Sequence, residues 1–348
     1  AGGLIVDSES GTFAAGNVQF GNEGSSMARR EFSRRLFIRQ SVHAAAAAGL
    51  VRGSARSATG QEAKPGNERS IRLGAPAFAG TEDPEELARW HRAAGYRAAY
   101  CPGVSLRDPD VVRAVEEAFA RHDVTLAEVG RWVNLLDADP KKRKENLATV
   151  TEGLALADEI GARCCVDIAG SFSTEYWYGP HPENLSARFF DAAVENARAI
   201  IDAVKPRRAK FCYEMMGWAL PDSADSYVKL LKAVDRNSFA VHLDPCNLVN
   251  SPRRFYHNTA LLNECFDKLG PHIVSCHAKD LHWNVEMNVH FQEVTLGAGQ
   301  LDYETYLKRL AALPGDVPLM IEHMKGEQEY DKSRKHLFEV GEKVGIEW

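Results

Sequence analysis

The chain has 348 residues, of which 45% are hydrophobic and 26% charged, with a formal net charge of −6. This composition is typical of a globular protein with a large core, and the acidic balance argues against a nucleic-acid-binding protein, which would normally carry a basic surface. Seven cysteines without a C-x-x-C pair indicate neither a zinc ribbon nor a disulfide framework.

Three segments precede the first predicted strand. Residues 1–26 are rich in Gly, Ser and Asn and contain no Met, so we expect a non-native or disordered leader. Residues 27–58 contain the run SRRLFIR from Ser33, which resembles the twin-arginine export signal, and an Ala-rich stretch too short to span a bilayer. Residues 59–70 are polar and contain Gly, Pro and Ser, which predicts a linker. The resemblance implies export by the twin-arginine machinery to the periplasm or the medium without a stable membrane anchor; a basic N-terminal helix of a cytoplasmic protein is the alternative.

From Ile71 onward, short apolar runs alternate with longer amphipathic ones, which predicts alternating strands and helices. The predicted strands are 71–74, 96–101, 124–129, 162–168, 211–214, 241–244, 273–277 and 318–322. The predicted helices open at Asp83-Pro84 and Asp108-Pro109 and follow at 139–160, 185–204, 223–234, 260–269, 303–313 and 329–344. Eight strand–helix units predict one α/β domain, a single (β/α)8 TIM barrel over residues 71–348. A doubly wound open sheet is the alternative fold, but no Gly-rich phosphate loop follows the first strand.

The last four predicted strands each end in a residue that can ligate a metal. These residues are Glu214, Asp244, His277 and Glu322. Because the carboxyl ends of barrel strands form the active face, we expect the four side chains to converge there. Two Glu, one Asp and one His suit a divalent cation with mixed oxygen and nitrogen ligands. A capping carboxylate or a core histidine could explain any one of them, but four successive strand ends favour a metal site.

The second half of the chain also resembles the xylose isomerase-like TIM-barrel superfamily, the sugar isomerases and epimerases related to ketose 3-epimerases and inosose dehydratases. The motifs that carry the resemblance are YE at 213–214, HLDPCN at 242–247, CHAKD at 276–280, GAGQLDY at 297–303 and IEH at 321–323. The resemblance implies that Glu214, Asp244, His277 and Glu322 hold one divalent metal, with Mn expected and Mg, Co or Zn as alternatives. It also implies that Glu214 and Glu322 serve as acid and base at the substrate carbon.

Other residues are candidates for contact with a small carbohydrate substrate, which is the expected partner. The candidates are Asn247, Lys279, Asp280, Glu128, Trp132, Trp177, Trp218 and Trp283. The tryptophans follow strand ends, where aromatic rings can form a platform for a sugar. Salt bridges and ordinary loop packing are the alternative roles for these residues. A homo-oligomer is left open.

The leading hypothesis is a metal-dependent isomerase or epimerase that moves a proton on a sugar or keto-sugar through an enediolate. A lyase or dehydratase is the close alternative, because the same enolate could expel a leaving group from a keto-sugar or a 3-keto-glycoside. A secreted sugar-binding barrel without catalysis is the alternative of another class. A related endonuclease would need further His and acidic ligands and a basic face, and neither is evident in the sequence.

Overall fold

The computed structural model describes residues 70–348. The predicted leader, the twin-arginine segment and all of the linker except Ser70 lie outside the described residues. Within the described part, no helix has both the length and the apolar character needed to cross a membrane.

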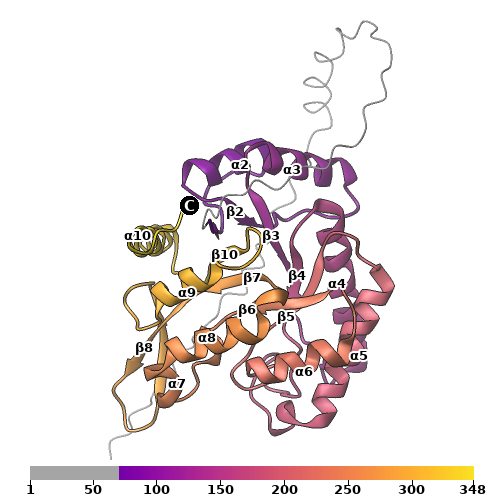
Figure 1. Ribbon diagram of the computed structural model, residues 1–348. Helices are drawn as coiled ribbons and strands as arrows, with labels where there is room; N and C mark the ends of the chain where they lie inside the picture. Colours follow the sequence, from indigo (N-terminus) through magenta and orange to yellow (C-terminus); the bar gives the residue numbers. More distant parts are fainter. Residues whose placement is uncertain (1–69) are drawn as a thin grey trace, which may run out of the picture. The chain divides into compact units, whose positions relative to one another are not determined.

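Eight parallel strands close into a barrel, which confirms the predicted (β/α)8 fold (Figure 1). The strands are β1 (Arg72–Ala75), β2 (Ala98–Tyr100), β3 (Thr125–Gly130), β4 (Cys164–Asp167), β5 (Lys210–Glu214), β6 (Phe239–Leu243), β7 (Ile273–Ala278) and β10 (Pro318–Ile321). Their order around the barrel is β1, β10, β7, β6, β5, β4, β3 and β2. The strands that carry the four ligand candidates are therefore consecutive neighbours on one side of the barrel.

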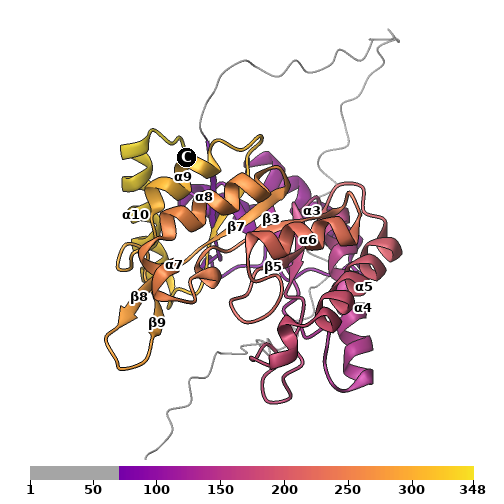
Figure 2. The ribbon, with the colours of Figure 1, turned by 60° about the horizontal axis from the view of Figure 1, so that its bottom comes forward.

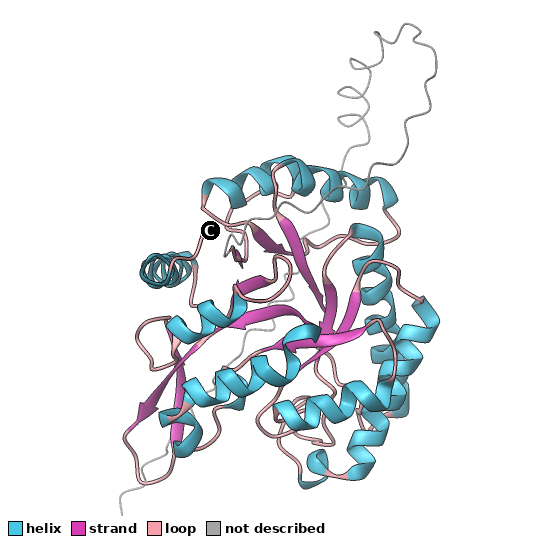
Figure 3. Ribbon diagram, in the orientation of Figure 1, coloured by secondary structure: helices cyan, strands magenta, loops and turns pink. Residues whose placement is uncertain are grey.

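Helices surround the strands in the part of the chain that the structure describes (Figure 3). They are α2 (Pro84–Ala93), α3 (Pro109–Arg121), α4 (Pro140–Ile160), α5 (Ala187–Val204), α6 (Ala224–Val234), α7 (Pro252–Tyr256), α8 (Asn258–Leu269), α9 (Tyr303–Leu310) and α10 (Glu327–Val344), with 3-10 turns η1 (Pro182–Leu185), η2 (Cys246–Leu248) and η3 (Gly270–His272). Asp83 and Asp139 cap α2 and α4, since each carboxylate accepts a backbone N–H of the first turn and Pro follows at the first helical position. Gly161 ends α4 with φ 77°, a left-handed conformation that favours glycine.

Small side chains and Met320 form part of the barrel interior. A Cβ on Gly74 of β1 would clash with the Met320 sulfur of β10, so only glycine leaves room for this methionine. Cys164 and Cys212 line the interior together with Ala240, and all three are buried. These free thiols are buried packing groups.

The sequence did not predict an antiparallel hairpin between β7 and α9. Its strands are β8 (Asp280–Asn284) and β9 (His290–Val294), and it extends beyond the helix layer (Figures 1 and 2). The tip exposes Val285 and Met287 almost completely. Because the segment mixes polar and apolar residues and lacks an Asn-Gly or Asp-Gly turn, neither its period nor its turn chemistry marked it as a hairpin.

Candidate metal centre

The four ligand candidates converge at the carboxyl ends of their strands. Glu214 ends β5, Asp244 follows β6, His277 lies in β7 and Glu322 follows β10. One ligand atom from each lies within 4.8 Å of the ligand atoms of the other three. Asp244 and His277 are fully buried, Glu214 is 4% exposed and the Glu322 side chain is 16% exposed. The cluster is thus most accessible from the side of Glu322.

Distances around His277 match the spacing of ligands that share one ion. The His277 Nδ1 atom lies 3.0 Å from Glu322 Oε2, 3.3 Å from Glu214 Oε1 and 3.5 Å from Asp244 Oδ2. Neighbouring atoms that are each about 2.1 Å from a common ion would lie roughly 3.0 to 3.4 Å apart. Three carboxylate oxygens and one imidazole nitrogen form a donor set that suits divalent cations.

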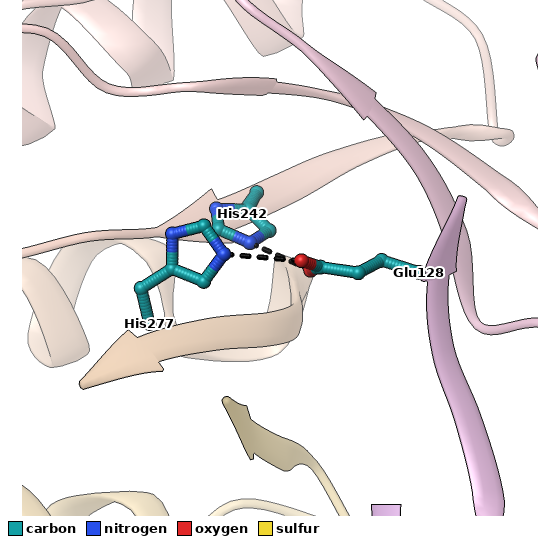
Figure 4. A group of neighbouring side chains, drawn as sticks. All are labelled: Glu128, His242 and His277. Atoms are coloured by element: carbon teal, nitrogen blue, oxygen red, sulfur yellow. Dashed lines mark hydrogen bonds and ion pairs between the residues drawn. The ribbon is translucent and has the colours of Figure 1, made fainter. Parts of the chain in front are cut away.

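The two ring nitrogens of His277 face different groups, and Nδ1 is the one directed at the other ligand candidates. Its Nε2 lies 3.0 Å from Glu128 Oε1, so Nε2–H donates to that carboxylate (Figure 4). Nδ1 is then the nitrogen that faces three carboxylate oxygens, whose mutual repulsion favours positive charge between them. The residues present therefore fit a divalent cation.

Lys279 adds positive charge to this cluster. Its Nζ lies 2.7 Å from Glu322 Oε2, 2.9 Å from Asp244 Oδ2 and 3.6 Å from Glu214 Oε1. Burial lowers the pKa of Lys279, but Asp244, Glu322 and Glu214 outweigh it and hold that pKa well above the usual value. Asp244 Oδ2 and Glu322 Oε2 nevertheless have no hydrogen-bond partner with acceptable geometry, so their contacts with Lys279 are close ion pairs. Both buried oxygens keep lone pairs that a cation could use.

The side-chain amide of Asn247 is hydrogen-bonded to Glu214. Its Nδ2 donates to Glu214 Oε1 at 2.8 Å and to the Met215 carbonyl at 3.0 Å. Asp244 Oδ1 in turn accepts the backbone N–H of Cys246 at 3.0 Å. Both N–H groups of the Asn247 amide are engaged within the protein, so the structure favours a role in orienting Glu214 over the predicted contact with substrate.

The carboxylate of Asp280, a predicted substrate contact, is hydrogen-bonded to the backbone of the protein. Its carboxylate is 1% exposed and accepts four backbone N–H groups at 2.9 to 3.1 Å. The donors are Leu281, Gly297, Gly299 and Leu301. Asp280 therefore folds the GAGQL loop onto the start of the hairpin and has no lone pair directed at a substrate.

Replacing Gly299 with alanine is expected to lower the free energy of unfolding by about 1 to 3 kcal/mol, the usual cost of overpacking. The added Cβ would clash with Asp280 Oδ1 and would lie 2.5 Å from the Leu281 carbonyl oxygen. Gly103→Ala is the matched control, because its Cβ would meet nothing within 4 Å. Urea unfolding of both variants checks this, and equal midpoints would contradict the role assigned to the loop.

Glu128, another predicted substrate contact, has two histidines and a serine as its partners. It is fully buried beneath the ligand cluster, where Oε2 lies 2.9 Å from His242 Nε2 and accepts from Ser275 Oγ at 3.1 Å. Burial opposes ionisation of Glu128, but His277 and His242 outweigh it and lower the pKa of the carboxyl to about 2. The sequence analysis did not single out His242. In an extended segment, residues two apart point to the same face, so His242 and Asp244 could have been placed together.

The four candidate tryptophans do not form one surface. Trp132 is near the cluster, with its ring centroid 6.3 Å from that of His277 and 37% of the residue exposed. Trp177 and Trp218 gather around Tyr178, whose carbonyl accepts the Trp218 indole N–H at 2.6 Å. Trp283 packs at the hairpin against Phe255, Tyr256 and Phe291. Trp132 is the one of the four that the structure places beside a ligand candidate.

The hairpin brings a further acidic residue to the rim. Glu293 of β9 lies 2.7 Å from His323 Nδ1 through Oε2 and 4.0 Å from Lys279 Nζ through Oε1. His323 follows Glu322 directly and adopts φ 60°, a left-handed conformation that is uncommon outside glycine. This contact fixes the hairpin beside Glu322, and nothing in the alternation of the segment predicted it.

Comparisons with known proteins agree with this architecture. A family model described as xylose isomerase-like TIM barrel matches residues 88–340, and no curated protein matches the chain. A xylose isomerase-like TIM barrel protein from Mycobacterium smegmatis, solved in complex with magnesium, is 16% identical with a TM-score of 0.56 over 80% of this chain and 99% of that one. Endonuclease IV from Thermus thermophilus is 16% identical with a TM-score of 0.58 over 78% and 99%. A 3-keto-D-glucoside 4-epimerase from E. coli is 14% identical with a TM-score of 0.55 over 78% and 100%. At these identities the likeness shows the fold alone.

Proposed function

The chain belongs to the xylose isomerase-like TIM barrel family, and on that premise we propose that it is a divalent-metal-dependent isomerase or epimerase of sugars or keto-sugars. The observation that carries the proposal is the convergence of three carboxylate oxygens around His277 Nδ1 at the rim of the barrel. The family includes enzymes of this kind, and a keto-glucoside epimerase shares the fold. Endonuclease IV shares it equally, but the net charge of −6 argues against a nucleic-acid substrate.

Glu214 and Glu322 are the proposed acid and base. In the strand order, β6 and β7 lie between the strands that carry them, so the two carboxylates approach the site from different sides. One carboxylate would take the proton from the carbon next to the substrate carbonyl, and the other would return a proton to the opposite face, which inverts that carbon. A divalent cation held by Glu214, Asp244, His277 and Glu322 would supply positive charge for the enediolate oxygens. Lys279 adds a fixed positive charge at the same place.

Incubation of the Mn²⁺-loaded protein with a panel of keto-sugars and 3-keto-glycosides in D2O tests this function. We expect an epimerised sugar that carries deuterium at the inverted carbon and keeps all its substituents. Release of water or of an aglycone would overturn the epimerase assignment in favour of a lyase. Sugar binding without any turnover or exchange would favour a non-catalytic sugar-binding barrel.

Replacing Trp132 with alanine is expected to raise KM about tenfold, equivalent to about 1.4 kcal/mol of lost binding. Trp132 is partly exposed beside His277, where its ring can pack on the apolar face of a sugar. Steady-state kinetics measure the change, and Trp132→Phe is the matched variant that keeps an aromatic platform. A KM unchanged in the alanine variant would place the substrate elsewhere on the rim.

A further inference from the structure

We propose that Glu128 is a positioning residue that fixes the ring orientation and tautomer of His277, with His242 as the second donor of the same buried network. The inference rests on the proposed metal site but concerns residues that lie beneath it. Glu128 comes from β3, which lies opposite β7 in the barrel with three strands between them on either side. Its side chain therefore crosses the barrel interior to reach His277.

The contacts show one carboxylate serving two imidazoles. His277 Nε2 lies 3.0 Å from Oε1 of Glu128, and His242 Nε2 lies 2.9 Å from Oε2 (Figure 4). The rings themselves meet edge to face with centroids 4.2 Å apart. Ser275 Oγ donates to the same Oε2 at 3.1 Å. Glu128 thus accepts three hydrogen bonds, and each imidazole is held by both the carboxylate and the other ring.

This network keeps a proton on Nε2 of His277 and turns Nδ1 toward the ligand cluster. With Nε2–H bonded to Glu128, Nδ1 is the nitrogen that faces Glu214, Asp244 and Glu322 and that a cation could take as its ligand. Without an acceptor at Nε2, a proton on Nδ1 would be favoured beside those carboxylates and would block coordination. A carboxylate behind a metal-binding histidine also raises the basicity of the ligand atom.

His242 fits the same assignment. Its Nδ1 is buried without a hydrogen-bond partner. An N–H at that position would be a buried donor with no acceptor, so the proton of the ring lies on Nε2 and points to Glu128. His242 is then a neutral donor that occupies the second oxygen of Glu128 and leaves the first for His277.

The three residues could also be taken for a second metal site, since their ligand atoms lie within 4.8 Å of one another. The geometry favours hydrogen bonds instead. Both nitrogen–oxygen distances are those of N–H···O contacts, and the oxygen near His242 also accepts from Ser275. A second ion would have to displace both ring protons from a fully buried position. The stoichiometry of metal binding distinguishes the two cases.

The test compares Mn²⁺ binding by calorimetry in wild type, Glu128→Gln, Glu128→Leu and the control Glu264→Gln. Glu128→Leu is expected to weaken affinity about 100-fold and Glu128→Gln about 10-fold, because glutamine keeps one acceptor oxygen but no charge. Glu264→Gln should bind as wild type does, since this residue lies on the outer helix α8 and pairs with Lys268. Wild-type affinity in Glu128→Leu would overturn the proposal, and so would two ions in wild type that fall to one in this variant.

A second readout does not depend on metal. In proton–nitrogen spectra of protein labelled at histidine, the His277 ring should carry a proton on Nε2, hydrogen-bonded to Glu128, in wild type and lose this hydrogen-bonded proton in Glu128→Leu. If wild type bound no Mn²⁺, the proposed function would fail while the spectra still decided the role of Glu128. A His277 ring without a proton on Nε2 in metal-free wild type would overturn the proposal. If Glu128→Leu does not fold, Glu128→Gln, whose side chain has the same shape as that of glutamate, provides the same measurements.

Discussion

Replacing Glu322 with glutamine is expected to lower kcat about 100- to 10,000-fold, the range that general acid–base catalysis supplies. The substitution removes the ability to accept a proton but keeps an amide oxygen where Oε2 now lies 3.0 Å from His277 Nδ1. We therefore expect the Mn²⁺ content to fall much less than kcat. Glu322 is the most exposed of the four candidates and the one best placed to meet a substrate carbon.

Rates of turnover and of deuterium exchange, measured on Mn²⁺-loaded protein, check this prediction. Glu214→Gln should show a similar loss, because inversion needs a carboxylate on each side of the carbon. Glu264→Gln is the control, since this residue lies on the outer helix α8 and pairs with Lys268. Undiminished exchange in both the Glu322 and Glu214 variants would remove them from the proposed mechanism.

Mn²⁺ is expected to stabilise the folded protein, and Asp244→Asn is expected to abolish most of that stabilisation. A ligand at a concentration about 100 times its Kd adds about 2.7 kcal/mol to the free energy of unfolding when it binds only the folded state. Burial opposes ionisation of Asp244, but Lys279 and His277 outweigh it and hold the pKa of this carboxyl below its usual range. Asp244 is therefore charged at neutral pH and available to a cation.

Thermal unfolding with Mn²⁺ and with a chelator measures this effect. Asn at position 244 can still accept the backbone N–H of Cys246 through its own oxygen, so the local turn should persist. The unfolding temperature of the variant should rise much less with Mn²⁺ than that of wild type. Equal shifts in both proteins would mean that the ion binds elsewhere.

The barrel and the convergence of the four ligand candidates were predictable because both depend on local patterns. Apolar runs that alternate with amphipathic helices specify parallel strands, and a polar residue at each strand end is brought to one rim by the closure of the sheet. Two strands end one residue earlier than predicted, at Leu243 and Ile321, which leaves Asp244 and Glu322 just beyond the ladder.

The partners of these residues were not predictable from local patterns. Glu128 and His277 are separated by 149 residues and meet only because β3 and β7 face each other across the barrel. Asp280 looks like a site residue beside Lys279, yet its carboxylate is used by backbone groups of a loop that the sequence left without structure. The twin-arginine segment lies outside the described residues, and export to the periplasm or the medium stays a prediction.

The number of divalent ions bound per chain tests the central claim most directly. Equilibrium dialysis against Mn²⁺, followed by elemental analysis, should find one ion per wild-type chain and nearly none in a double variant with Asp244→Asn and Glu322→Gln. A wild type without bound ion, or a double variant that binds as wild type does, would contradict a metal centre at these four residues.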